Sequence, residues 1–487
     1  MRSRWLMLGV VVLLLAGLSI SLLAARGPRR PEAQPPAVRA AQLGAYDAQR
    51  PSADPTPEPS VRLPEEPTVY GLPPKGAEPF RHFGGPYKRF FLIPLEDAGP
   101  VREEPERTGV ETVSIGFLGP IKAPGKASAV PGYEVPYGQA MLRGCQLAIE
   151  QANAAGGYQG KPFVLKVHND SGLWGATSNE VSKMAYDENC VAFLGSINGA
   201  NTHIALRVAL KIEIPMINSA DTDPTLTETR IPWLMRVNPD DRHLSYGLAE
   251  RIFRVLRYRR VAVLRANEDY CRRAVVEFRD TARRLGYPIH MEKRFVLGTR
   301  DFSPHLNDIK RAQVECVAMW GEPDDVGRAV KQMRQMGMQQ PIFTGHRIID
   351  PRFPQAAGDA AEGVVAASQW DPTRDDPKLK AFLQAYEKRF DMPADTWAAH
   401  AYDGMQLVIK AIGKAGLNRA RIMDSLVQDY TLKTYQGVTG TIKFDHVLND
   451  IGPVWLARFE GGKWVYEAAP RTYEIGLGAG LQAHPQR

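Results

Sequence analysis

Short apolar runs alternate with amphipathic stretches along most of the chain between residues 113 and 367. Runs of about four to eight apolar residues are typical of buried strands, and apolar residues that recur about every 3.6 positions are typical of helices. We predict strands at residues 113–118, 163–167, 191–194, 215–217, 261–264, 316–320, 342–344 and 364–367. This alternation of strands and helices indicates mainly parallel sheets joined by right-handed crossovers.

Small polar residues follow two of the predicted strands. Strand 191–194 leads into Asn-Gly-Ala-Asn-Thr at residues 198–202, and strand 215–217 leads into Asn-Ser-Ala-Asp-Thr at residues 218–222. Gly199 would let a ligand approach the backbone, and free N–H groups at a helix start attract anionic groups. Open parallel sheets bind ligands beyond the carboxyl ends of their strands, so the two turns converge on one place. Each turn taken alone is also explained as a plain helix cap.

The alternating pattern falls into two halves, which further helices and a hairpin follow. Helices are predicted at residues 379–390, 398–412 and 419–429, and the segments 455–459 and 464–466 flank Gly461-Gly462, which predicts a hairpin. The late helices must return to cover the first half. We therefore predict an α/β protein of two lobes with a ligand cleft between them. Lobe 1 would comprise residues 110–240 plus 368–450, lobe 2 residues 241–367 plus 451–468, and residues 469–487 a loose tail.

The beginning of the sequence carries an export pattern. Met-Arg-Ser-Arg precedes an apolar run that ends at Ala25, so residues 1–25 are expected to be a signal peptide or an N-terminal membrane anchor. Residues 26–109 are rich in proline and are expected to form a largely disordered spacer. The protein is therefore expected in the periplasm or another extracytoplasmic compartment, and anchoring to the inner membrane by the N-terminal helix stays open.

Composition and motifs exclude several classes of function. The 487 residues carry a mild formal charge of +7 without a dense basic stripe, which argues against a nucleic-acid partner. The sequence contains no P-loop, no Gly-x-Ser-x-Gly elbow, no His-Glu-x-x-His and no Cys-x-x-Cys motif. We predict no enzyme activity, no catalytic residues, no metal and no cofactor. The four cysteines are expected to be buried free thiols, with a Cys145–Cys190 disulfide as the alternative.

Several segments together resemble one known family. The segments are residues 113–120, 137–139, 144–157, 215–224, 236–241, 261–270, 357–363 and 401–404. Their order and spacing resemble the leucine/isoleucine/valine-binding proteins, which are type I periplasmic solute-binding proteins of ABC importers. The resemblance covers residues 110–467 and implies the two-lobed type I periplasmic-binding-protein fold. It also implies a small-molecule ligand and a membrane permease as partners, and the protein is expected to be a monomer.

The resemblance implies a set of ligand-binding residues. Gly199, Ala220 and Thr222 would hold a ligand carboxylate from lobe 1, with Thr202 close by. Tyr137 would line the pocket for the ligand side chain, and Asp241 would lie at the first crossing between the lobes. Tyr270 would close over the ligand from lobe 2, and Glu322 and His346 would occupy two further positions of that lobe. Structural alternatives remain: a helix cap for Asp241, a surface aromatic for Tyr270, and solvated loop residues for Glu322 and His346.

The sequence departs from the family pattern at several of these positions. Gly199 stands where a hydroxyl residue is common, and Glu322 stands where an aromatic is common. His346 stands where amino-acid binders place a carboxylate, and a neutral histidine supplies only a hydrogen-bond acceptor. Residues 122–135 lengthen the loop before Tyr137, and the loop carrying Trp174 would border the cleft. The ligand therefore stays open between an amino acid, an amide and a small carboxylate. Tyr402 and Asp403 resemble a family signature and are expected to pack within lobe 1.

The resemblance and the export pattern together imply an extracytoplasmic protein that would capture a small polar ligand by hinge closure and deliver it to an ABC-type importer. The alternative is a membrane-tethered receptor domain that uses the same fold to sense a ligand.

Overall fold

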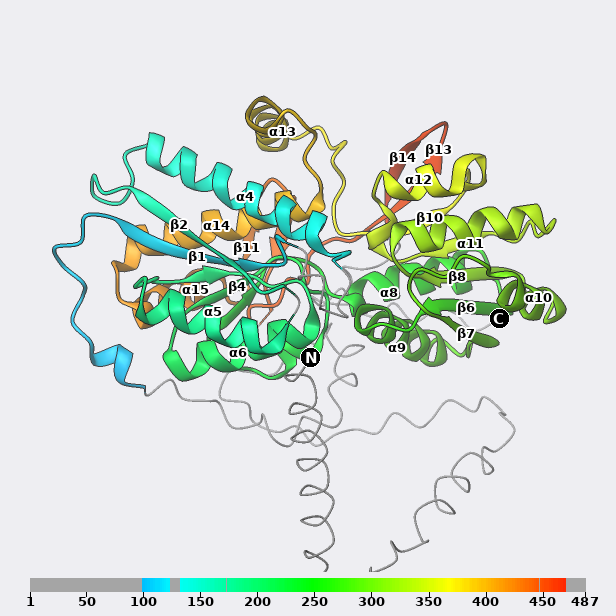
Figure 1. The fold of residues 1–487 in the computed structure, drawn as a ribbon, viewed down its shortest axis with the longest axis horizontal. Helices are drawn as coiled ribbons and strands as arrows, with labels where there is room; N and C mark the ends of the chain where they lie inside the picture. The colour runs from blue at the N-terminus through cyan, green and yellow to red at the C-terminus, as the bar shows by residue number, and fades with distance from the viewer. Residues whose placement is uncertain (1–98, 123–131, 172, 446, 470–487) are drawn as a thin grey trace, which may run out of the picture. The chain divides into compact units, whose positions relative to one another are not determined.

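A computed structural model describes residues 99–122, 132–171, 173–445 and 447–469 (Figure 1). The predicted signal peptide or anchor, most of the predicted spacer, the loop 123–131 and the tail 470–487 lie outside the described residues. Among the residues that are described, no helix combines the length and the apolar character needed to cross a bilayer.

The first sheet has five parallel strands in the order β2-β1-β3-β4-β5. Its strands are β1 Val113–Gly119, β2 Phe163–Asn169, β3 Phe193–Leu194, β4 Met216–Asn218 and β5 Leu234–Arg236. The helices that accompany it are α4 Val135–Ala154, α5 Trp174–Tyr186, α6 Gly199–Ile212, α7 Thr225–Glu228, α13 Pro377–Phe390, α14 Thr396–Ala415 and α15 Arg419–Tyr430. A small antiparallel pair, β11 Thr434–Gln436 and β12 Thr441–Lys443, completes this group of elements, which we call lobe 1.

Both faces of the first sheet are covered by helices. Neighbouring residues of each strand point to opposite sides of the sheet and so belong to different cores. Phe193 of β3 and Met216 of β4 belong to a core with α5 and α6. The following residues, Leu194 and Ile217, belong to a larger core with α4 and α14. Figure 1 shows α4 and α14 on one side of the sheet and α5 and α6 on the other. The late helices α13, α14 and α15 thus contribute to the same core as α4.

The second sheet has seven strands in the order β14-β13-β10-β9-β8-β6-β7. Its strands are β6 Val261–Ala266, β7 Met291–Phe295, β8 Cys316–Trp320, β9 Ile342–Thr344, β10 Val365–Ser368, β13 Trp455–Glu460 and β14 Lys463–Ala468. The last two form the predicted hairpin, and β13 pairs antiparallel with β10. The helices are α8 Asp241–Ala249, the π-helix η3 Glu250–Val255, α9 Asp269–Arg284, α10 Ser303–Arg311, α11 Pro323–Gln335 and α12 Arg352–Ala357, with the short 3-10 turns η4 His346–Ile348 and η5 Gly358–Ala361. We call this group lobe 2.

A separate core fills lobe 2, with α8 and α9 on one side of the sheet and α11 and α12 on the other (Figure 1). Both lobes are therefore mainly parallel α/β units flanked by helices, which confirms the predicted fold class.

The chain passes between the lobes near a fully buried arginine, Arg236 at the end of β5. Its Nε donates to Asn449 Oδ1 at 2.7 Å, and its Nη2 donates to Asp240 Oδ2 at 2.9 Å. Gln369, just after β10, donates to the Pro239 carbonyl at 2.8 Å. Side chains from all three crossing segments are thus tied together where a hinge would bend.

Part of the predicted spacer packs on lobe 1. Residues Pro100–Glu103 form a 3-10 turn, η2, in which Val101 is buried. The Val101 amide donates to Glu213 at 2.9 Å, and the Arg102 guanidinium pairs with Asp424 of α15 at 2.6 Å. The folded body therefore begins some ten residues earlier than the sequence pattern indicates.

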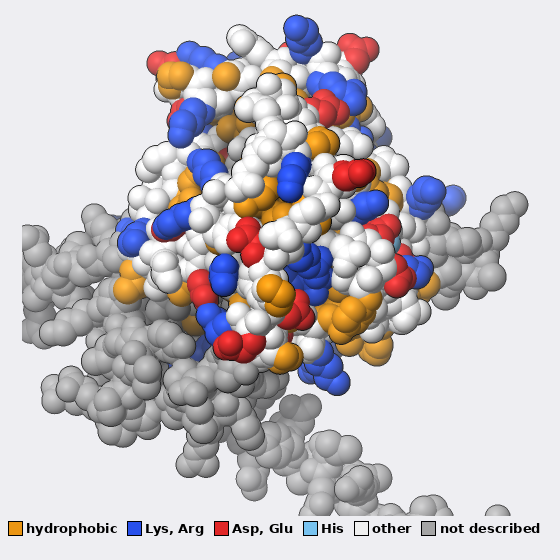
Figure 2. Space-filling view, turned by 90° about the vertical axis from the view of Figure 1, so that its left-hand side faces the viewer, with side chains coloured by type: hydrophobic (Ala, Val, Ile, Leu, Met, Phe, Trp, Pro, Cys, Tyr) orange, Lys and Arg blue, Asp and Glu red, His pale blue; other side chains and the backbone are white. Residues whose placement is uncertain are grey.

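Figure 2 shows the outer face of lobe 1, the left-hand side of Figure 1. Lys and Arg side chains are interspersed with Asp and Glu side chains on this face, and small apolar areas lie among them. A mixed surface of this kind provides no concentrated positive potential for a polyanion.

Candidate functional site

The two polar turns of lobe 1 lie side by side, because β3 and β4 pair in parallel through Leu194 and Ile217. Gly195 directly follows β3 with a φ of 145°, and a Cβ there would come within 2.0 Å of the Leu118 carbonyl oxygen, so only glycine fits. The Asn198 side chain then caps α6 by accepting from the Ala200 amide at 3.2 Å.

The turn after β4 is held by its own acidic and amide side chains. Asn218 Oδ1 accepts from the Asp221 amide at 3.0 Å, Asp221 Oδ1 from the Asp223 amide at 3.0 Å, and Asp223 Oδ1 from the Thr225 amide at 2.9 Å. Side chains of Asn and Asp favour such turns because they replace a backbone acceptor. One oxygen of each aspartate is used in this way, and the second oxygen stays outside the turn.

Lobe 2 contributes the first turns of two helices and one short turn. Asp241 begins α8, and its neighbour Asp240 caps that helix by accepting from the His243 amide at 3.0 Å. Asp269 and Tyr270 begin α9, and Arg273 follows one turn later on the same face. Arg347 lies in η4.

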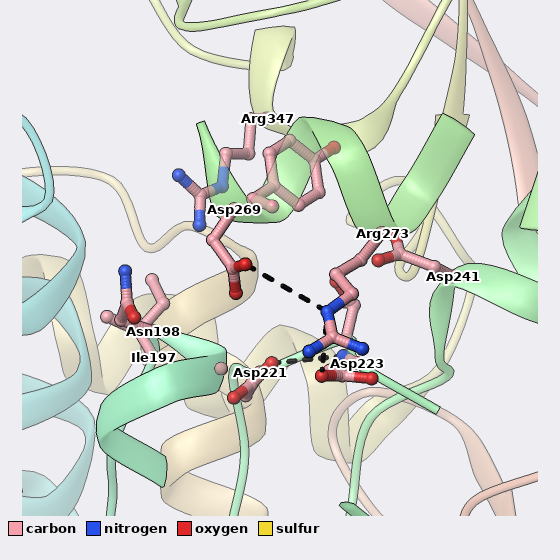
Figure 3. A pocket seen from close by; sticks show the side chains of 11 residues that line it. Ile197, Asn198, Asp221, Asp223, Asp241, Asp269, Arg273 and Arg347 are labelled. Carbon is pink, nitrogen blue, oxygen red and sulfur yellow. Dashed lines mark hydrogen bonds and ion pairs between the residues drawn. The ribbon is translucent and has the colours of Figure 1, made fainter. Parts of the chain in front are cut away.

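These segments of both lobes line one pocket of about 270 Å³ (Figure 3). From lobe 1 it is lined by Ile197, Asn198, Gly199, Asp221, Thr222 and Asp223, and from lobe 2 by Asp241, Asp269, Tyr270, Arg273 and Arg347. Figure 3 shows the charged ends of Asp221, Asp223, Asp269 and Arg273 directed toward one another within it. The pocket is therefore small and dominated by ionisable groups, with the Tyr270 ring as its aromatic wall.

Burial changes the protonation of these acids. Burial, and then the charge of Asp223, raises the pKa of Asp221 to about 7. Burial also raises the pKa of Asp241 well above its ordinary value, although a hydrogen bond with Thr222 opposes this. Asp223 is likewise buried, but His203 and Arg273 lie 3.5 Å from its Oδ2 and lower its pKa to about 2. Two acids of the pocket are thus poorly stabilised as anions, and one is well stabilised.

Hydrogen bonds and ion pairs join the lobes beside the pocket. Tyr137 of lobe 1 donates its hydroxyl hydrogen to Glu322 Oε2 at 2.8 Å and accepts from Arg352 Nη2 at 2.9 Å. Arg347 pairs with Glu134 of lobe 1 at 3.2 Å and with Glu322 at 2.7 Å. The Arg347 guanidinium also stacks on the Tyr270 ring, 4.1 Å from its centroid. We call this set the interlobe latch.

Four of the nine residues that the resemblance implies line the pocket: Gly199, Thr222, Asp241 and Tyr270. The other five are not among the residues that line it. Thr202 donates to the Asn198 carbonyl at 2.9 Å, and the Ala220 amide donates to Asn218 Oδ1 at 3.3 Å. Tyr137 and Glu322 belong to the interlobe latch.

His346 contacts the Tyr270 hydroxyl through Nδ1 at 3.3 Å, and its Nε2 has no hydrogen-bond partner among the described residues. Burial, and then the charge of Arg347, lowers its pKa well below the ordinary value, so the ring is neutral at pH 7. The ring centroid lies 5.5 Å from that of Trp397 in lobe 1, so His346 is packed between the lobes rather than solvated.

Structural alternatives for other residues are also decided. Asp240 rather than Asp241 caps α8, so the cap explanation for Asp241 is wrong. Glu322 and Tyr270 are buried, so neither is a surface group. Trp174 is 65% exposed and does not line the pocket. All four cysteines are buried and free, so Cys145 and Cys190 are not bridged.

Sequence reasoning missed five charged residues of the pocket: Asp221, Asp223, Asp269, Arg273 and Arg347. The first two stand in the turn that the strand pattern identified, and their acidity was the available signal. Asp269 and Arg273 lie on one helix face with Tyr270, at a spacing of four residues. Across the described part of the chain, no group of three or more His, Cys, Asp or Glu side chains is arranged to hold a metal ion.

Comparisons with known proteins agree with this arrangement. The periplasmic binding protein family matches residues 112–463. The leucine-, isoleucine-, valine-, threonine-, and alanine-binding protein of Pseudomonas aeruginosa is 23% identical over 336 residues, which cover 69% of this chain and 86% of that protein. The Leu/Ile/Val-binding protein homolog 2 of Brucella abortus is 24% identical over 325 residues, which cover 66% of this chain and 85% of that protein.

Solved structures share the fold. The branched-chain amino acid transporter substrate-binding protein LivJ of Streptococcus pneumoniae, in complex with isoleucine, superimposes with a TM-score of 0.65 at 26% identity, covering 73% of this chain and 99% of that chain. An ABC-transporter solute-binding protein of R. palustris, in complex with benzoate, superimposes with a TM-score of 0.65 at 16% identity, covering 76% of this chain and 100% of that chain. Two lobes around one pocket, together with a family match over most of the sequence, place the chain in the periplasmic binding protein family, with the type I fold.

Proposed function

We propose that the protein binds a small polar ligand between its lobes, outside the cytoplasm, and delivers it unchanged to the permease of an ABC importer. The observation that carries this proposal is the pocket itself, because both lobes contribute residues to it. A ligand held there contacts both lobes and so favours the arrangement in which they meet.

Unpartnered polar atoms support the same function. Within the described residues, the buried side-chain atoms without a hydrogen-bond partner include Asp221 Oδ2, Asp241 Oδ2 and Arg347 Nε, and all three residues line the pocket. Buried polar atoms in folded proteins are nearly always paired, so a cluster of unpaired ones is expected where a ligand supplies the partners. The similar proteins are named for binding amino acids, and the R. palustris structure holds benzoate, which makes small amino and carboxylate compounds the first candidates.

A thermal-shift screen tests the proposal. The full chain is melted with amino acids, amides, amines and small carboxylates, and hits are titrated by calorimetry. A ligand present at about 100 times its Kd stabilises the folded protein by about 2.7 kcal/mol, so the melting temperature must rise. Recovery of the ligand after dialysis, chemically unchanged, is expected from a binder.

Two variants locate the binding. Thr222→Ala and Asp241→Ala each remove a side chain that lines the pocket and should abolish the shift. Asp280→Ala removes an exposed carboxylate of α9 and should leave the shift intact. Normal binding by both pocket variants would show that the ligand binds elsewhere.

A further inference from the structure

Carboxylates outnumber cations in the pocket. Asp221, Asp223, Asp241 and Asp269 face only two guanidinium groups, those of Arg273 and Arg347. Both arginines already have acidic partners of the protein. Arg347 pairs with Glu322 and Glu134, and Arg273 Nε lies 3.5 Å from Asp223 and 3.9 Å from Asp269. Acids of the protein therefore already match the charge of each arginine, and Arg347 Nε is the pocket-lining arginine atom that is buried without a hydrogen-bond partner among the described residues.

Two of the four acids are left without a counter-charge. Asp221 is 4% exposed and Asp241 is 2% exposed, and each has one oxygen, Oδ2, without a hydrogen-bond partner among the described residues. Within the described part of the chain, neither carboxylate has an ion pair within 4 Å, whereas Asp223 Oδ2 lies 3.5 Å from both His203 and Arg273. A buried carboxylate oxygen without a donor is costly, and a cationic donor with several N–H groups relieves that cost best.

The place where a ligand carboxylate would sit is already acidic. The start of α6 at Gly199 is the natural seat for an anion in lobe 1. A Cβ built on Gly199 would lie 3.2 Å from Asp269 Oδ2 and 3.3 Å from Asp223 Oδ2, so two carboxylates of the protein border this position. A ligand carboxylate placed there would repel both of them.

We propose that the ligand of this site is a small organic cation without a carboxylate, whose ammonium, amidinium or guanidinium group donates to Asp221 and Asp241. The proposal rests on the proposed function and specifies its ligand class. Both lobes line the pocket, which suits a small compound, and the Tyr270 ring offers a face for the cation or for an apolar portion of the ligand. An inorganic cation is disfavoured because the pocket acids do not form a group of three arranged around one ion.

The raised pKa values of the two acids agree with this proposal. Asp221 and Asp241 are held as anions only with difficulty in the ligand-free pocket. A bound cation would stabilise their ionised forms, so binding should release protons from the acids that are protonated in its absence.

Matched compounds test the ligand class. Leucinamide and leucine differ only at the carboxyl end, as do agmatine and arginine, and 4-methylpentanoate supplies the carboxylate without the amine. Calorimetry at pH 7.5 on the full chain should find at least one of the two cations bound about tenfold or more tightly than its zwitterionic partner, and no binding of the acid. A zwitterion or the acid as the tighter ligand would overturn the cation proposal while leaving the binding function in place. If no compound of any class binds, both the proposed function and the ligand class fail.

Charge-neutral variants test the residues. Asp221→Asn and Asp241→Asn keep the shape of the side chain and remove its charge, and each should weaken the best cation about tenfold or more. Asp280→Asn is the matched control, because its exposed carboxylate lies on the outer part of α9. Circular dichroism establishes that each variant is folded. Undiminished cation binding by both folded pocket variants would overturn the assignment to these two acids.

Discussion

The interlobe latch can be weakened without disturbing either core, and Tyr137→Phe is the smallest change that does so. Tyr137 is buried at the start of α4, and its ring packs on Trp397 of lobe 1 with a centroid distance of 4.9 Å. Its hydroxyl group contacts Glu322 and Arg352 of lobe 2, and the guanidinium groups of Arg347 and Arg352 lie 5.6 and 5.3 Å from the centroid of its ring. The substitution removes the two hydroxyl contacts and keeps the ring with its guanidinium contacts.

The size of the effect follows from the partners. A hydrogen bond to a charged group contributes about 1.5–3 kcal/mol net. Glu322 keeps Arg347 at 2.7 Å, and Arg352 keeps Asp350 at 2.9 Å, so neither is left alone. We therefore use a value near the low end of this range and expect the closed arrangement, in which the lobes meet, to lose about 2 kcal/mol of stability relative to an open form. This loss lowers the ratio of closed to open protein by a factor of about 30.

Two measurements together decide the outcome. If the open form dominates without ligand, the apparent Kd of the best ligand rises about 30-fold, because only the closed fraction binds. If the closed form dominates without ligand, the Kd changes little and the radius of gyration from solution scattering increases instead. Tyr402→Phe is the control, since its hydroxyl contacts Gln151 within lobe 1 at 2.6 Å and its loss should change neither quantity. A Tyr137→Phe protein with unchanged Kd and unchanged scattering would refute the latch.

Three further outcomes are expected. Asp240→Ala should lower the free energy of unfolding by about 3–5 kcal/mol in denaturant titrations, because it leaves the fully buried Arg236 without its carboxylate. All four thiols are buried, so they should resist a thiol reagent in the native protein and react fully in denaturant, and reducing agents should not shift the melting temperature. Asp221 has a folded-state pKa of about 7 against an ordinary value near 4. Its contribution to stability is therefore present below about pH 4 and is lost as the pH rises through 7. The melting temperature of the ligand-free wild-type protein should accordingly fall more between about pH 5 and pH 8 than that of Asp221→Asn. The titratable and charged groups around Asp221 are Asp223 and His203 of lobe 1, together with Asp241, Asp269, Arg273 and Arg347 of lobe 2, which line the same pocket.

The fold was predictable because burial on both faces leaves long apolar runs in the sequence. Residues 261–264 and 316–320 were predicted as strands and are found in β6 and β8. Strands β5 and β7 escaped prediction for a physical reason. The strand β5 is three residues long and ends in Arg236, whose charge suggests a surface position although it is fully buried. The strand β7 lies at the sheet edge and carries three charged residues, so its pattern is weak.

The site was predictable only as far as local chemistry determines it. The sequence places two acids together at 240 and 241 and two basic residues at 346 and 347, but it does not say which of each pair faces the pocket. Asp240 is used as a helix cap and as the partner of Arg236, which leaves Asp241 for the pocket. The short turn η4 directs Arg347 rather than His346 to the pocket wall. Such choices depend on contacts between segments far apart in the chain.

Two opposing contributions set the closure of the lobes without a ligand. The interlobe latch favours closure, whereas closing buries Asp221 Oδ2 and Asp241 Oδ2 without donors and so opposes it. Asp221→Asn should therefore act in the opposite direction to Tyr137→Phe: with no charge to bury, the ligand-free protein should close more and its radius of gyration should fall or stay at the closed value. The radius of gyration of the Tyr137→Phe/Asp221→Asn double variant should lie between those of the two single variants, because the Tyr137 hydroxyl and the Asp221 carboxylate do not contact each other. An Asp221→Asn protein that scatters as a more open particle than the wild type would mean that the pocket charge holds the lobes together, and the balance of forces argued for this cleft would have the wrong sign.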